Sequence, residues 1–278
     1  MLDCLRSRWV IVAFIVMATA VLPHGVFAGE TLDRPVVKAS ALYMIELQSG
    51  RVLLEKNATR RLPPASLTKI MTALVALEAA PLQQVVKIDG RAIVHRSSLH
   101  FQDGEEYLLR DLVTAMLVAS ANDACEAVAW HIGGGATEFV TRMNERAKTL
   151  GLDDTHFTNA CGFDAPGHYS TAADLAKVTQ RALQIPAISM MVRTVVRTIA
   201  TVDGTRQVVL QSTNELLADP DVTGVKTGYT SKAGRCLIAS MFKDGHQLLL
   251  VALNVIDRWE QAPKLLRYGQ MMLRAETG

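Results

Sequence analysis

The chain has 278 residues, of which 49% are hydrophobic, and its formal net charge is +2 at pH 7. This length and apolar content allow a large buried core in one or two domains. The nearly balanced charge gives no support for nucleic-acid binding or for a polybasic membrane patch.

The first 28 residues have the three-part pattern of a secretory signal peptide. Arg6 and Arg8 precede an unbroken apolar run over residues 9–22, and residues 26–28 offer a small-residue cleavage site. The run is shorter than the roughly 20 residues that a membrane-spanning helix needs. We therefore favour cleavage near Ala28 over a retained anchor, and expect a secreted, periplasmic protein.

The remaining chain alternates between strand-like and helix-like patterns. Period-2 and β-rich runs predict strands over residues 39–54 (two strands around a turn), 194–202, 207–210, 224–230, 235–242 and 246–255. Helical periodicity predicts helices over residues 66–78, 108–118, 124–132, 137–150, 173–183 and 263–274.

Strands thus lie at both ends of the chain and helices lie in the middle. This order predicts an α+β fold in which the terminal segments pair into an antiparallel sheet. We expect one domain over residues 29–278, with the sheet part at about 36–95 and 195–278. A helical insert at about 96–194 would separate the two sheet segments.

Ser66 and Lys69 form the first motif that carries chemistry. Residues three apart on a helix have Cβ atoms about 5–6 Å apart, so the amine can reach the hydroxyl. Serine needs such a neighbour to become a nucleophile. Free lysine has a pKa of about 10.4, which burial and a second cation, such as Lys226, would lower. We expect Lys69 to be desolvated, partly neutral and able to deprotonate Ser66.

Two further polar motifs follow along the chain. Ser120-Ala121-Asn122 falls on a predicted loop of the helical insert, and Lys226-Thr227-Gly228 falls on a late predicted strand. S-x-x-K, S-x-N and K-T-G in this order are the signature of penicillin-binding proteins and class A β-lactamases. We expect the three motifs to converge in a cleft between the sheet and the helical part.

The resemblance extends beyond the three motifs. Residues 64–78, 120–134, 156–176 and 224–240 resemble the D-alanyl-D-alanine carboxypeptidases, the low-molecular-mass penicillin-binding proteins of the S11 peptidase family. This resemblance implies a β-lactamase/transpeptidase-like fold, an antiparallel sheet flanked by helices with an inserted all-helical subdomain. The C-terminal β-domain and the membrane-binding helix of many relatives are not evident, so we expect no C-terminal anchor.

The resemblance also implies a role for each motif residue. Ser66 would attack the carbonyl of the penultimate D-Ala in a peptidoglycan stem peptide, with Lys69 as the general base. Ser120 would relay a proton between Lys226 and the leaving amine. No metal and no cofactor are implied.

Substrate binding is assigned in the same way. Asn122 would hydrogen-bond the peptide backbone, and Lys226 and Thr227 would bind the terminal carboxylate. Gly228, which lacks a side chain, would let the substrate lie close to the strand. The backbone N–H groups of Ser66 and Tyr229 would form the oxyanion hole. The implied partners are stem peptides ending in D-Ala-D-Ala, and β-lactam antibiotics as covalent inhibitors.

Three other activities share this signature. An endopeptidase would cut D-alanyl–diaminopimelate cross-links, and the motifs do not distinguish it from a carboxypeptidase. A β-lactamase would need a deacylating glutamate, which class A enzymes use and which residues 152–162 lack. We therefore expect slow release of penicillin. A penicillin-binding sensor would usually carry transmembrane helices besides this domain.

The cysteines and histidines are assigned structural parts. Cys125, Cys161 and Cys236 follow the signal peptide, so at most one internal disulfide can form. We expect the three to be small apolar fillers. No histidine or cysteine pair has metal-ligand spacing, and His156 and His168 are expected to be structural or to line the cleft.

Overall fold

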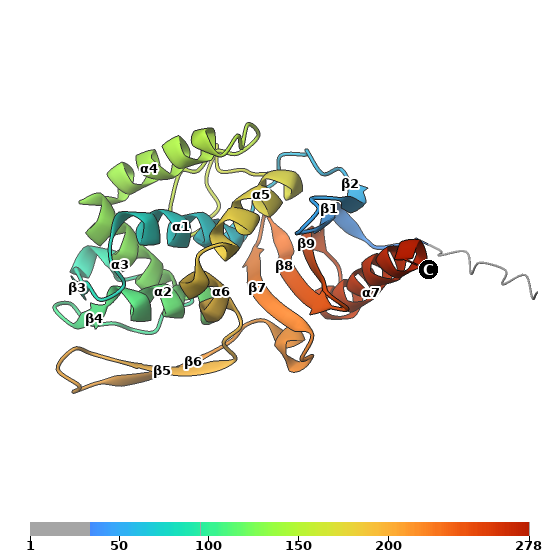
Figure 1. Ribbon diagram of the computed structural model, residues 1–278. Helices are drawn as coiled ribbons and strands as arrows, with labels where there is room; N and C mark the ends of the chain where they lie inside the picture. The colour runs from blue at the N-terminus through green and yellow to red at the C-terminus, as the bar shows by residue number, and fades with distance from the viewer. Residues whose placement is uncertain (1–33, 95, 278) are drawn as a thin grey trace, which may run out of the picture. The chain divides into compact units, whose positions relative to one another are not determined.

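The computed structural model describes residues 34–94 and 96–277 (Figure 1). The predicted signal peptide lies outside these residues. The strands are β1 Ala39–Glu46, β2 Val52–Lys56, β3 Val85–Lys87, β4 Glu106–Leu108, β5 Val196–Ala200, β6 Gln207–Gln211, β7 Val222–Thr230, β8 Gly234–Lys243 and β9 His246–Val255. The α-helices are α1 Lys69–Ala79, α2 Leu109–Val118, α3 Asn122–Gly133, α4 Ala136–Thr149, α5 Ala172–Leu183, α6 Pro186–Val192 and α7 Arg258–Thr277, and the 3-10 turns are η1 Ala65–Thr68, η2 Gly90–Ala92 and η3 Glu215–Ala218.

The main sheet has five strands in the order β2-β1-β9-β8-β7. All of its neighbouring pairs are antiparallel, and β1 near the N-terminal side pairs with β9 near the C-terminal end, as in Ala41 opposite Leu253. The predicted pairing of the two ends of the chain is confirmed. Because β7 is at the edge, one side of this strand has no neighbouring strand in the sheet.

Both faces of the sheet are buried, which explains the continuous apolar runs of β8 and β9. Along β9, Leu248 and Leu250 join the core under α7, whereas Leu249 and Val251 join the core under the other helices. This alternation is the period of two that a strand imposes. Figure 1 shows α7 on one face of the sheet and α5 on the other.

The other helices form a layer beside the sheet. The central helix α1 is buried from Lys69 to Ala76, as expected of a helix that is apolar on all sides. Around it lie α2, α3 and α4 (Figure 1). The pairs β3–β4 and β5–β6 form two separate two-stranded sheets. The expected sheet part, at about 36–95 and 195–278, includes β3, β5 and β6, which do not join the main sheet.

The predicted helices and strands are present, with differences at Asn122 and at the start of the last helix, and with the short elements β3, β4 and α6 not predicted. Asn122 is the first residue of α3, whereas a loop was expected there. The last helix begins at Arg258, and Pro263 lies inside it. Pro263 is the sixth residue of this helix, beyond the first four N–H groups that have no intrahelical partner, so it costs the helix one backbone hydrogen bond. The short helix α6, which has a proline in its first turn, was not predicted.

Candidate active site

Ser66 lies on the 3-10 turn η1, directly before α1. The ammonium of Lys69, the first residue of α1, donates to Ser66 Oγ over 3.0 Å. Ser66 is half-buried, so its hydroxyl can meet a ligand, whereas Lys69 is 0% exposed. The predicted hydroxyl–amine pair is therefore formed.

Two other oxygens accept hydrogen bonds from Lys69. Nζ donates to Asn122 Oδ1 and to the Cys161 carbonyl, each over 2.7 Å. Burial lowers the pKa of Lys69 to about 7, while the Glu126 carboxylate acts in the opposite direction. A base whose pKa is close to the working pH combines a neutral fraction with useful basicity.

Asn122 is held by its own backbone and side-chain hydrogen bonds. Its N–H donates to the Ser97 carbonyl over 2.8 Å, and its Nδ2 donates to the Arg96 carbonyl over 2.7 Å. These contacts leave Oδ1 free to accept from Lys69. The preceding turn contains Ser120 at φ +59°, the left-handed region.

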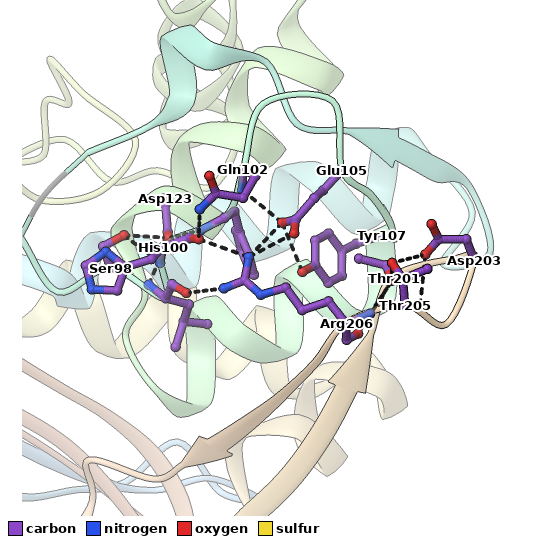
Figure 2. A network of polar contacts seen from close by, with 12 residues as sticks. Ser98, His100, Gln102, Glu105, Tyr107, Asp123, Thr201, Asp203, Thr205 and Arg206 are labelled. Carbon is purple, nitrogen blue, oxygen red and sulfur yellow. Dashed lines mark hydrogen bonds and ion pairs between the residues drawn. The ribbon is translucent and has the colours of Figure 1, made fainter.

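The segment 96–101 that holds Asn122 is itself tied down on two sides. Asp123 Oδ2 accepts from Ser98 Oγ over 2.6 Å and from the Leu99 N–H over 2.8 Å. On the other side, Arg206 of the β5–β6 hairpin donates to the Leu99 and His100 carbonyls and to Glu105, each over 2.9 Å. Figure 2 shows this network reaching from α3 to the hairpin.

The third motif lies on the edge strand β7, beside Ser66. A Cβ atom on Gly228 would stand 3.1 Å from the Ser66 nitrogen and 3.1 Å from the Ala65 Cβ. A side chain at Gly228 would force these neighbours to shift, so a glycine suits this close approach. The strand β7 and the turn η1 that carries Ser66 are thus in contact at Gly228.

Lys226 and Thr227 are both buried. Lys226 Nζ donates to the Thr227 carbonyl over 2.9 Å, and the Thr227 hydroxyl lies 2.6 Å from that of Thr213. The pKa of Lys226 is well below its ordinary value, first because of burial and then because of the positive charges of Lys69 and Arg258. Such a site gains stability from an anion.

Arg258, which the sequence analysis missed, supports β7 from the start of α7. Its Nη1 donates to the Gly228 carbonyl over 3.0 Å and to the Cys236 carbonyl over 3.1 Å. Its buried Nε has no partner among the described residues. The sequence signal was weak, an arginine just after an apolar strand. Its position beside Gly228 arises from the strand order β9-β8-β7, which the sequence does not reveal.

The loop 159–164 contacts the site as well: it reaches Lys69 and the end of β7. Asn159 Oδ1 accepts from the N–H groups of Cys161, Gly162 and Phe163. Asp164 accepts from the Thr230 hydroxyl over 2.6 Å, which ties this loop to the end of β7. These hydrogen bonds fix the position of the loop, and with it the position of the Cys161 carbonyl that accepts from Lys69.

Cys125 and Cys161 form a disulfide, with Cα atoms 5.9 Å apart. The expectation of three apolar fillers is wrong for this pair. Cys236 is buried and free, as expected. The prediction failed because Cys125 and Cys161 are brought together by packing of α3 against a loop, which their sequence spacing of 36 does not reveal.

Some predicted site residues are hydrogen-bonded to one another, and others are near them only because β7 contacts the Ser66 turn. Ser66, Lys69 and Asn122 are linked by hydrogen bonds. Within residues 34–94 and 96–277, no hydrogen bond joins Ser120 to Lys226. The Tyr229 side chain is 65% exposed, which suits a residue that is expected to contribute only its backbone N–H.

In the described part of the chain, no group of three or more His, Cys, Asp or Glu side chains could hold a metal ion. No helix there is long and apolar enough to cross a bilayer.

Comparison with solved structures identifies the fold. The Streptomyces K15 DD-transpeptidase superposes with a TM-score of 0.81 at 30% identity, covering 86% of this chain and 99% of that protein. The predicted α+β transpeptidase-like fold is confirmed. This comparison supports the predicted arrangement of an antiparallel sheet with helices.

Sequence comparison identifies the family. The chain is 35% identical to D-alanyl-D-alanine carboxypeptidase DacF of Bacillus subtilis over 84% of its length, and 36% identical to DacD of Escherichia coli over 88%. It covers 62% and 67% of those proteins. It is also 30% identical to a D-alanyl-D-alanine endopeptidase of Pseudomonas aeruginosa, of which it covers 81%. The profile of the Peptidase S11 family, described as D-alanyl-D-alanine carboxypeptidase, matches residues 28–257. The chain therefore belongs to the D-alanyl-D-alanine carboxypeptidase family S11.

Proposed function

We propose that this protein is a serine-type D-Ala-D-Ala carboxypeptidase that removes the terminal D-Ala from peptidoglycan stem peptides. The observation that carries the proposal is the buried Lys69 ammonium, 3.0 Å from the half-buried Ser66 hydroxyl. Its pKa of about 7 leaves a large neutral fraction at neutral pH. Family membership supplies the substrate class, because the matching profile is that of D-alanyl-D-alanine carboxypeptidases.

Acylation follows from this geometry. Neutral Lys69 takes the proton of Ser66, and Ser66 Oγ bonds to the carbonyl carbon of the penultimate D-Ala. The negative charge on the carbonyl oxygen is stabilised by the backbone N–H groups of Ser66 and Tyr229, and the contact of Gly228 with the Ser66 nitrogen places these two segments side by side. Losing one oxyanion donor typically costs about 10²–10³ in rate.

The terminal D-Ala then leaves with a proton on its amine. Ser120 passes this proton from Lys226, the buried second lysine. Lys226 and Thr227 bind the terminal carboxylate, whose charge offsets the unfavourable burial of cations at this point. Asn122 hydrogen-bonds the stem peptide, and water finally hydrolyses the ester on Ser66.

The deciding experiment supplies the protein with two substrates separately, a pentapeptide stem and a cross-linked dimer, and identifies the products by mass. Free D-Ala from the pentapeptide alone supports a carboxypeptidase. Cleavage of the dimer alone contradicts it. The variant Ser66→Ala should abolish both activities and labelling by fluorescent penicillin, and labelling that persists would exclude Ser66 as the nucleophile.

The second candidate is an endopeptidase acting on D-alanyl–diaminopimelate cross-links. The observation that favours it is the endopeptidase relative, of which this chain covers 81%. The open edge of β7 would accept an extended peptide equally from either substrate. The dimer arm of the same experiment tests this candidate.

β-Lactams should acylate Ser66 and leave slowly. Residues 152–162 contain no glutamate to activate water, so we expect one rapid burst with nitrocefin and then little turnover. Fast steady turnover would favour a β-lactamase. Export to the periplasm is part of the proposal, and the signal pattern of residues 1–28 supports it.

A further inference from the structure

The Cys125–Cys161 disulfide joins the two segments that hold Lys69. Asn122 lies one helical turn before Cys125 on α3 and accepts from Lys69 through Oδ1. Cys161 accepts from the same ammonium through its own carbonyl. Both acceptors of Lys69 other than Ser66 are therefore connected by one covalent bond.

Other contacts tie the loop to different neighbours. The Thr72 hydroxyl on α1 donates to the Ala160 carbonyl over 2.6 Å, and Asp164 ties the loop to β7. Between this loop and α3, the disulfide is the covalent link. Without it, the spacing between Asn122 Oδ1 and the Cys161 carbonyl would depend on packing alone.

We propose that the Cys125–Cys161 disulfide positions the acylation centre by fixing the two oxygen acceptors around Lys69, so that the oxidised protein acylates faster than the reduced one. The proposal rests on the proposed roles of Ser66 and Lys69. A misplacement of about 1 Å can cost about 10²-fold in rate. The disulfide is thus a positioning element, since it acts on the substrate only through Lys69.

Reduction would break the Cys125–Cys161 bond and leave two thiols near Lys69. A dithiol gives two electrons and two protons, the S–S bond breaks, each sulfur gains a proton, and the dithiol becomes a cyclic disulfide. The Glu126 carboxylate oxygen lies 3.3 Å from Cys161 Sγ, so the new thiol would have a charged acceptor nearby. Both cysteines are almost completely buried, and we therefore expect reduction only after unfolding.

The bond itself is tested first by peptide mapping of the full chain, alkylated under denaturing conditions without reductant. A Cys125 peptide linked to a Cys161 peptide, which separates on reduction, is expected. Alkylation of both cysteines before reduction would overturn the proposal.

The positioning role is tested with the double variant Cys125→Ala/Cys161→Ala, with Cys236→Ala as the matched loss of a buried cysteine. At saturating fluorescent penicillin, the double variant should acylate at least about tenfold more slowly, with an unchanged half-saturating concentration. The Cys236→Ala variant should keep the wild-type rate. The pH at which the rate rises should move upward in the double variant, because water would reach Lys69.

A merely structural bond gives a different result. Loss of folded protein lowers the amplitude of labelling, whereas each folded molecule still reacts at the wild-type rate with the wild-type pH profile, and that result would overturn the proposal. If the double variant does not fold, wild-type protein refolded and held in dithiol must lose rate and regain it on reoxidation. Absence of Ser66 labelling in untreated wild type would instead refute the proposed function.

Discussion

Lys69 donates hydrogen bonds to three oxygens while its side chain is fully buried. Burial stabilises the neutral form, and the Glu126 carboxylate acts in the opposite direction, which leaves the pKa of Lys69 at about 7. A small change in the surroundings of this one nitrogen should therefore shift the reaction's dependence on pH.

The first prediction concerns Glu126, whose carboxylate raises the pKa of Lys69. Acylation by penicillin should increase with pH as Lys69 loses its proton, with a midpoint near 7. In Glu126→Gln the raising charge is gone, so the midpoint should move to lower pH. Stopped-flow acylation between pH 5 and 9 measures it. Glu145→Gln, an exposed glutamate on α4, should leave the midpoint in place, and an unmoved midpoint in Glu126→Gln would refute the coupling.

The second prediction concerns Gly162, which has φ +87°. A Cβ atom there would stand 1.9 Å from the Ala65 carbonyl oxygen, next to Ser66. Gly162→Ala should therefore lose most of its acylation rate. Gly151→Ala is the matched control, since Gly151 also has positive φ but nothing within 4 Å; it should cost only about 1–2 kcal/mol in free energy of unfolding. Equal losses in the two variants would contradict a steric cause.

The sequence predicted the pairing of Ser66 with Lys69 because the two residues are three positions apart, within reach on one helical turn. It could not predict the Cys161 carbonyl, Glu126 or Arg258. Each of these reaches the site through packing between distant segments, and a backbone carbonyl has no signature in a side-chain pattern. Their roles had to come from the structure.

At the scale of elements, the β5–β6 hairpin is connected to the active site through the segment 96–101. Arg206 on this hairpin holds two carbonyls of that segment (Figure 2), and the same segment holds Asn122. The hairpin lies beside α2 rather than in the main sheet (Figure 1). Through this segment, the hairpin helps to hold Asn122 in position.

The third prediction follows for Arg206→Leu. Two carbonyls and Glu105 would lose a charged donor, at about 1–3 kcal/mol for each group left unsatisfied. We expect a lower melting temperature and slower acylation, measured by thermal denaturation and penicillin labelling. Arg197→Leu, exposed on the facing strand β5, is the control. Wild-type acylation in Arg206→Leu would show that Asn122 does not depend on the hairpin.

Elements with strong periodicity were predicted within a few residues, such as α2, α4, β8 and β9. The short strands β3 and β4 were missed because three residues give no usable pattern. The start of α7 was placed late because a proline usually marks a helix start, and here Pro263 lies in the second turn. Tertiary packing against the sheet extends that helix backwards.

At the scale of the whole molecule, the buried His168 connects the turn η1 to the loop 156–168. His168 Nδ1 accepts from the Thr158 N–H over 3.0 Å, and Nε2 lies 3.0 Å from the Thr68 hydroxyl, which itself donates to Ala65. Both ring nitrogens are thus satisfied in the neutral form. Burial, with a smaller contribution from His156, lowers the pKa of His168 to about 4.

The fourth prediction is a loss of stability in acid. The folded-state pKa of His168 is below the unfolded value of 6.5, so the unfolded chain binds more protons in between. The free energy of unfolding that neutral His168 contributes is complete above pH 6.5. It falls by roughly 3 kcal/mol as the pH drops towards 4. Urea unfolding across this range should show a shallower pH dependence in His168→Gln. The exposed His100, changed to Gln, should keep the wild-type slope, and an equal slope in all three proteins would contradict the assignment.

The pairing of β1 with β9 also determines the order in which the chain can fold. Ser40 receives a hydrogen bond from Asn254, 214 positions later. The edge of β1 that pairs with β9 therefore stays unpaired until nearly all of the chain has been made. The contacts between the helices, in contrast, form between nearby segments. Folds dominated by such distant pairings form slowly, and an open strand edge attracts other chains. A chain that stops before β9 should consequently aggregate, even though every motif residue is already present.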